Sequence, residues 1–126
     1  MLVAVYGTLK RGYGNHRLLE GATFVEEDIV TGYDLTFSYG VGSFPVAMEG
    51  SGDVLVEVFD IGDDDVILSR LDALEGVPHM YTREEVVTND ARKVNMYVGN
   101  PDCFSHEMIP VPLNSDGIFE WRRAYG

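Results

Sequence analysis

The sequence predicts an α+β domain in which short antiparallel strands outnumber helices. Runs of β-branched and aromatic residues are typical of strands and cover most of residues 22–61, whereas only residues 63–75 have a convincing helical pattern. Hydrophobic residues make up 45% of the chain, as in ordinary globular proteins. With 126 residues, the chain is expected to form a single domain over residues 1–126.

The N-terminal segment predicts a buried strand followed by a tight loop. Leu2–Tyr6 is a short apolar run that ends at Gly7. Asn15 is a candidate N-cap for a short helix over His16–Glu20, with Gly21 as its C-terminal stop.

The middle of the chain predicts several short antiparallel strands. Glycine-rich segments at residues 40–42 and 50–52 are expected to separate them. Residues 53–59 alternate between polar and apolar types, so the three valines of this stretch should share one face of a strand.

The triplet Asp63-Asp64-Asp65 predicts the start of the main helix, because aspartate favours the positive end of a helix dipole. Gly76 and Pro78 should end this helix. The triplet is interpreted as a helix start and not as a metal site, since three adjacent side chains do not converge on one point.

Two further strands are expected over Met80–Thr88 and Arg92–Gly99, joined by a turn at Asn89-Asp90. The segment after Pro101 should be irregular because Pro110 and Pro112 interrupt it. Ile118–Trp121 is expected to dock as a last strand or a short helix.

Glu75 breaks the pattern of the predicted helix. At about 100° per residue, Ile67, Leu68, Leu71 and Leu74 form an apolar face, and Glu75 falls within the same sector. Burial and the negative end of the helix both disfavour its charged form, so its pKa should be raised. A carboxyl group that titrates near neutrality is suited to general acid/base catalysis. The alternative is that the helix frays before this residue and Glu75 points into water.

Two motifs accompany this glutamate: Val5-Tyr6-Gly7-Thr8-Leu9-Lys10-Arg11-Gly12 followed by Asn15-His16, and Leu74-Glu75-Gly76 followed by Pro78, Tyr81 and Arg83. Together they resemble the γ-glutamyl cyclotransferase superfamily, and most closely its γ-glutamylamine cyclotransferase and AIG2-like branch. The resemblance is clear over about the first twenty residues and over residues 71–83. It implies a small mixed, mostly antiparallel β-barrel flanked by short α-helices, with the first loop and Glu75 meeting at a pocket.

The resemblance also implies a reaction. The α-amine of a γ-glutamyl group would attack its own side-chain amide and release 5-oxoproline and a free amine, with no metal and no cofactor. Glu75 would act as general acid/base, and the backbone N–H groups of Gly7, Thr8 and Leu9 would bind the substrate carboxylate or the developing oxyanion. The partner would be a small γ-glutamyl amine or peptide.

The roles expected for other residues of the two motifs are less specific. Tyr6 and Tyr81 resemble pocket residues that shape the site or offer a hydroxyl, although packing in the core is an equally good interpretation of each. Asn15 is expected to cap a helix and hold the loop. Arg83 is expected to pair with one of its acidic neighbours, such as Glu84, in preference to the substrate.

Composition excludes several other functions. The 9 basic and 21 acidic residues give a net charge of −12, which disfavours binding to nucleic acids or anionic membranes. Cys103 is the only cysteine, so an internal disulfide is impossible and a reducing, cytoplasmic location is expected. The N-terminus is interpreted as a strand and not as a signal peptide.

Two rival hypotheses remain beside the cyclotransferase. The chain could be an enzyme on the same scaffold that acts on a different amide. It could also be a non-catalytic protein that keeps the pocket for binding a small ligand or for an interaction, since a fold alone does not determine function.

Overall fold

The computed structural model describes residues 1–38, 43–63, 65–104 and 108–122. The predicted separator at residues 40–42 and Asp64 of the acidic triplet therefore lie outside the described residues. Within the described residues the elements, in order, are β1 (Leu2–Val5), the 3₁₀ helix η1 (His16–Leu19), β2 (Thr23–Phe37), β3 (Val46–Asp60), α1 (Asp65–Glu75), β4 (Tyr81–Val87), β5 (Lys93–Gly99) and β6 (Ile109–Pro110).

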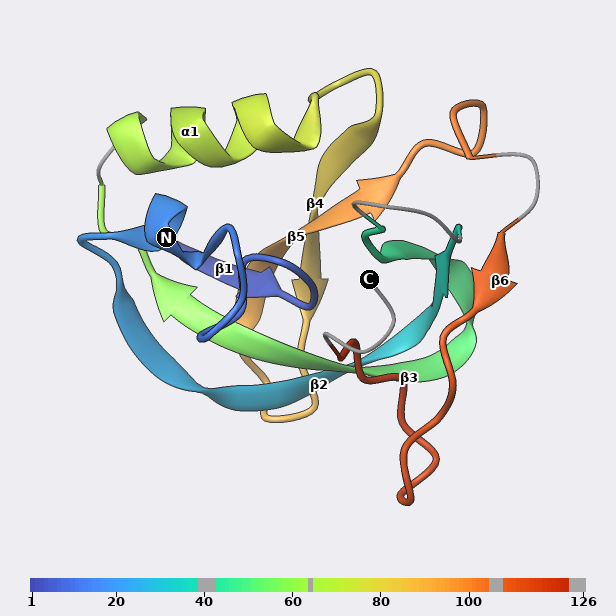
Figure 1. The fold of residues 1–126 in the computed structure, drawn as a ribbon. Helices are drawn as coiled ribbons and strands as arrows, with labels where there is room; N and C mark the ends of the chain where they lie inside the picture. Colours follow the sequence, from blue (N-terminus) through green and yellow to red (C-terminus); the bar gives the residue numbers. More distant parts are fainter. Residues whose placement is uncertain (39–42, 64, 105–107, 123–126) are drawn as a thin grey trace.

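The strands form one mixed sheet in the order β4-β5-β1-β3-β2-β6. The pair β1 and β5 is parallel, and every other neighbouring pair is antiparallel. The sheet curls into a half-barrel, with α1 lying across one side of it (Figure 1). This confirms the α+β class and the mostly antiparallel sheet. The hydrogen-bonded order ends at β4 and β6, so the described strands form a half-barrel and not a closed barrel.

The expectation of several short strands between residues 22 and 61 is wrong, because β2 and β3 are each 15 residues long. Gly50 and Gly52 lie inside β3 and do not end it. A side chain at Gly50 would collide with the carboxylate of Asp34 on β2. The Gly52 N–H donates to Asp34 Oδ1 at 3.0 Å. These glycines mark a close approach between strands, which is another reason for glycine within a strand.

Alternating residues of β1 face two hydrophobic cores. Ala4 belongs to the core that also contains the three valines of residues 53–59, which confirms that these valines share a face. Val3 and Val5 belong to the other core, together with Ile67 and Leu71 of α1. The first strand is thus buried on both faces, as its apolar run predicts.

The helices agree with expectation at the end of α1 and differ from it in three details, which are the exposure of Leu74, the type of the short helix and its cap. α1 ends at Glu75, and Gly76 follows with a φ of 61°, as predicted for a glycine stop. Leu74, however, is 40% exposed and does not belong to the buried face of α1. The short helix is a 3₁₀ helix, and no side-chain hydrogen bond of Asn15 caps it.

The C-terminal segment is more ordered than its prolines predict. Pro110 lies in β6 and pairs with Thr36 of β2, which an edge strand permits because it can leave one side unbonded. Phe119 forms isolated bridges with Val54 and Leu113, so the predicted last strand or short helix over residues 118–121 does not form. Trp121 is 2% exposed and packs in the core inside the curl.

A charged cluster joins β2 to the turn between β4 and β5. Arg92 contacts Glu26 at 2.6 Å and Asp28 at 2.9 Å. The Asn89 N–H donates to the carbonyl of Ile29 at 2.8 Å. Because β1 and β3 lie between β2 and β5 in the sheet order, these contacts stabilise the curl. Burial alone would raise the pKa of Asp28, but hydrogen bonds, including that from Arg92, lower it below its ordinary value.

We predict that Asp28→Asn lowers the free energy of unfolding by about 2 kcal/mol, because it removes a charge-assisted hydrogen bond at a buried site. Folding lowers the pKa of Asp28, so the difference in free energy of unfolding between the variant and wild type should reach its full size above roughly pH 3.9. It should shrink as the pH falls further. Urea denaturation at several pH values measures this. Glu26→Gln, at a half-exposed partner of the same arginine, is the control and should cost less than about 1 kcal/mol. Equal losses for the two variants would contradict this assignment.

Candidate active site

A cavity of about 240 Å³ lies where the end of α1 meets the loop after β1. Its lining residues are Ala4, Val5, Tyr6, Gly7, Thr8, Leu9, Asn15, Phe44, Pro45, Leu74, Glu75, Met80, Tyr81 and Tyr97. The structure thus brings together all the predicted site residues except Arg83.

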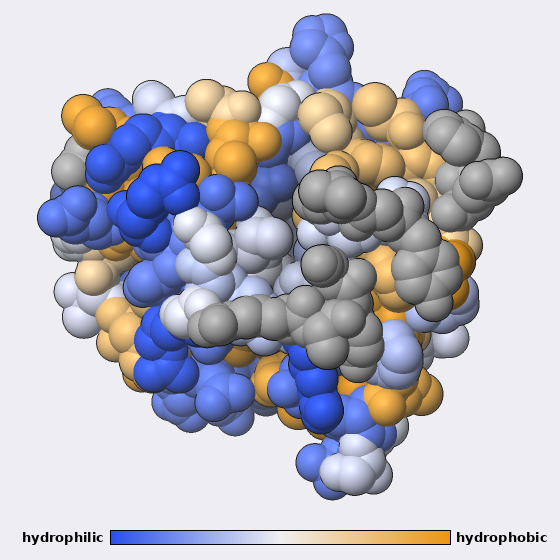
Figure 2. All heavy atoms as spheres, in the orientation of Figure 1, coloured by the Kyte–Doolittle hydropathy of each residue, from blue (hydrophilic) through white to orange (hydrophobic). Residues whose placement is uncertain are grey.

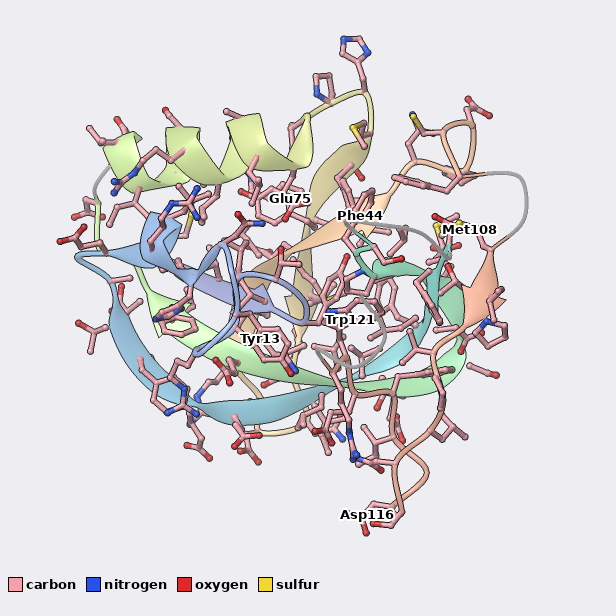
Figure 3. All side chains as sticks on the ribbon, viewed as in Figure 1. Tyr13, Phe44, Glu75, Met108, Asp116 and Trp121 are labelled. Atoms are coloured by element: carbon pink, nitrogen blue, oxygen red, sulfur yellow. The ribbon has the colours of Figure 1, made fainter. Side chains whose placement is uncertain are left out.

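Glu75 is the last residue of α1, so the helix does not fray before it. Its side chain is partly buried and lines the cavity, beneath the final turn of α1 in Figure 3. Burial raises its pKa from the ordinary value near 4.5 to about 7. Glu75 is also the only charged side chain among the described residues that line the cavity. A carboxyl group in this state can exchange a proton in either direction near neutral pH.

The loop after β1 is held by its own side chains. Asn15 Nδ2 donates to Thr8 Oγ1 at 3.0 Å, and the Asn15 N–H donates to the Thr8 carbonyl at 2.9 Å. Asn15 therefore holds the loop, as predicted, although it does not cap the helix. The ring of His16 contacts the Leu9 carbonyl through Nδ1 at 2.9 Å. These contacts fix the backbone that forms one wall of the cavity.

Gly7 is required at the start of this loop by close packing. A Cβ atom at Gly7 would lie 2.6 Å from Cγ of Pro45, well inside contact distance. The N–H groups of Gly7, Thr8 and Leu9 donate in none of the hydrogen bonds found among the described residues. This wall can therefore offer backbone donors to a ligand.

The two predicted tyrosines connect the walls of the cavity. The Tyr6 hydroxyl donates to the Tyr97 carbonyl at 2.7 Å and accepts from the Ala47 N–H at 3.2 Å. The Tyr81 hydroxyl donates to the Pro45 carbonyl at 3.0 Å. Burial raises the pKa of both phenols far above the ordinary value, so they stay protonated. Both line the cavity, and both hydroxyls are engaged in the framework.

Arg83 does not line the cavity. Its Nη1 lies 3.7 Å from Oδ2 of Asp72 on α1, so its acidic partner is Asp72 and not its neighbour Glu84. Asp72 Oδ1 also accepts a hydrogen bond of 2.6 Å from the hydroxyl of Tyr97. The arginine therefore belongs to a group that ties α1 to β4 and β5, one helical turn before Glu75.

Five residues of the lining were not expected from the sequence motifs: Ala4, Phe44, Pro45, Met80 and Tyr97. None belongs to a recognisable motif. Pro45 directly precedes β3 and Met80 directly precedes β4. Within the described ranges, no group of three or more His, Cys, Asp and Glu side chains is arranged to hold a metal ion. No helix in those ranges is both long and apolar enough to cross a bilayer.

The sequence matches a family model described as gamma-glutamyl cyclotransferase, AIG2-like, over residues 3–116. A candidate gamma-glutamylcyclotransferase of Pyrococcus horikoshii is 40% identical over 73 residues, which are 58% of this chain and 58% of that protein. The gamma-glutamylcyclotransferase family protein YtfP of Escherichia coli is 33% identical over 88 residues, which are 70% of this chain and 74% of YtfP.

Solved structures agree with this match. The solution structure of Escherichia coli YtfP has a TM-score of 0.66 at 27% identity and covers 98% of both chains. The crystal structure of an AIG2-like protein from Mus musculus has a TM-score of 0.66 at 22% identity, covering 97% of this chain and 96% of that one. The mouse structure shows the shared fold alone. With a family match from residue 3 to residue 116, this chain belongs to the gamma-glutamyl cyclotransferase, AIG2-like family.

Proposed function

We propose that this protein is a γ-glutamyl(amine) cyclotransferase-type enzyme that converts a γ-glutamyl amide into 5-oxoproline and a free amine. The observation that carries the proposal is the carboxyl group of Glu75, whose pKa of about 7 accompanies its position in a cavity also lined by Gly7, Thr8 and Leu9. Family membership supports the reaction class. The nucleophile and the electrophile belong to one molecule, so the site mainly has to fold the substrate and move protons.

In the first step, the Glu75 carboxylate accepts a proton from the α-ammonium of the substrate. The freed amine attacks the γ-carbonyl carbon, a C–N bond forms, and the carbonyl electron pair moves onto oxygen. Backbone N–H groups of Gly7, Thr8 and Leu9 bind the substrate carboxylate or stabilise this oxyanion. Holding the amine and the γ-carbonyl group close together in the bound substrate lowers the entropic part of the barrier.

In the second step, the carbonyl re-forms and the bond to the leaving nitrogen breaks. Overall, two protons move from the α-nitrogen to the leaving nitrogen, and Glu75 carries each in turn. The products are the lactam of 5-oxoproline and a free ammonium. A carboxyl group with a pKa near the working pH is effective here because it must both accept and return protons.

The proposed partner is a small γ-glutamyl amine or peptide, and the proposed location is the cytoplasm. The single exposed cysteine, Cys103, is compatible with a reducing compartment. The rival hypotheses are an enzyme acting on another amide and a binding protein that keeps the pocket.

We predict that Glu75→Gln lowers kcat/KM for 5-oxoproline release by roughly a hundredfold or more, because it removes the only carboxyl group among the described residues that line the cavity. The measurement is release from a panel of γ-glutamyl amides, γ-glutamyl dipeptides and glutathione. Glu20→Gln, at an exposed glutamate outside the cavity lining, is the matched control and should retain activity.

Three outcomes separate the hypotheses. Release by wild type and by Glu20→Gln, but not by Glu75→Gln, supports the proposal. Release that persists in Glu75→Gln contradicts the role of this residue. No release from any compound contradicts the reaction and leaves another amide or a binding role.

A second prediction needs no substrate. Folding raises the pKa of Glu75, so between about pH 4.5 and about pH 7 the folded state binds more protons than the unfolded state. As the pH rises across this window, the free energy of unfolding of wild type should therefore fall by up to about 3 kcal/mol relative to that of Glu75→Gln, since one pKa unit is worth about 1.4 kcal/mol. Urea denaturation of both proteins across the window measures it, and a constant difference would show that Glu75 titrates normally.

A further inference from the structure

Three exposed apolar side chains border the cavity beside Glu75. Phe44, Leu74 and Met80 all line it, and they are 38%, 40% and 37% exposed. They come from the segment before β3, the last turn of α1 and the residue before β4. Figure 2 shows apolar side chains near the end of α1 and beyond it. We refer to these three residues as the apolar rim.

The apolar rim is built into the structure around Glu75. Leu74 directly precedes Glu75, and Met80 packs on the turn that follows it, since a Cβ atom at Gly76 would lie 3.2 Å from Cγ and Sδ of Met80. The ring of Phe44 packs edge-on against Phe104 at a centroid distance of 6.3 Å. The leaving nitrogen must be within reach of Glu75, so the group attached to it is expected to extend along these side chains.

The described part of the cavity lining also lacks a cationic partner for a negatively charged leaving group. None of the described residues that line it is Lys, Arg or His. Arg83 on β4 is outside the lining and pairs with Asp72. The whole chain carries a net charge of −12. A carboxylate on the leaving group would lose water here without gaining a cation, which is unfavourable.

We propose that the leaving-group side of the cavity selects uncharged, apolar amines, so that the preferred substrates are γ-glutamyl amides of alkyl or arylalkyl amines and not γ-glutamyl peptides that end in a carboxylate. This inference rests on the proposed function and adds the class of the leaving amine. Contact with the apolar rim should raise kcat/KM by about two- to fourfold for each methylene that it removes from water.

The test measures kcat/KM for 5-oxoproline release from three sets of amides. The γ-glutamyl methyl-, propyl- and pentylamides vary apolar length. The glycine and glycinamide derivatives differ in the carboxylate. The pentylamide and 5-aminopentylamide differ in a terminal positive charge. We expect a gain of at least about tenfold from methyl to pentyl. We also expect the glycine derivative to be about tenfold poorer than the glycinamide, and the 5-aminopentylamide to be poorer than the pentylamide.

Variants connect this preference to the apolar rim. Leu74→Gln and, separately, Met80→Gln should flatten the dependence of log kcat/KM on chain length. Val66→Gln is the matched control, because Val66 is 64% exposed on the same helix but does not line this cavity. It should keep the wild-type slope, and thermal unfolding checks that all three variants fold.

The possible results separate this inference from the function on which it rests. If none of the amides releases 5-oxoproline, both the proposed function and this inference are overturned. Release that is independent of chain length, or faster for the glycine derivative or the 5-aminopentylamide, overturns this inference alone. A slope that survives in both rim variants shows that other residues set the preference, which also overturns the inference.

Discussion

The structure of the site depends on keeping the carboxyl group of Glu75 away from water at the end of α1. That position is set one turn earlier in the helix. Leu71 is fully buried against the core that contains Val3 and Val5. Asp72 accepts a 2.6 Å hydrogen bond from the hydroxyl of Tyr97 on β5. Because α1 is anchored by both its apolar face and a polar contact, its last residue has little freedom to turn toward solvent.

A cavity whose described lining holds one acidic side chain favours a particular kind of ligand. Burying the carboxyl group disfavours its charge, which is why its pKa rises to about 7. The α-ammonium of a γ-glutamyl group would supply the missing positive charge and at once become the proton donor of the proposed reaction. The same surroundings that make Glu75 a good base for this ammonium make the cavity unfavourable for a second carboxylate on the leaving group.

The sequence predicts those parts of the molecule that depend on local signals. The first strand, the glycine stop after Glu75 and the inward position of this glutamate follow from short-range patterns, and the structure has each of them. Long-range contacts determine the rest. Gly50 and Gly52 read as strand breakers until Asp34 is seen packing against them. The partner of Arg83 and the contribution of Phe44 to the cavity depend on how the sheet curls, which no local pattern records.

The proposed chemistry depends on Glu75 being a desolvated carboxyl group that titrates near neutral pH. The most direct measurement is an NMR titration of the protein labelled with ¹³C at the glutamate side-chain carboxyl carbons, with Glu75→Gln identifying the resonance. We expect a midpoint near 7 for Glu75. A midpoint near the ordinary value of about 4.5 would show that the group is solvated and lacks the property on which the proposed chemistry depends.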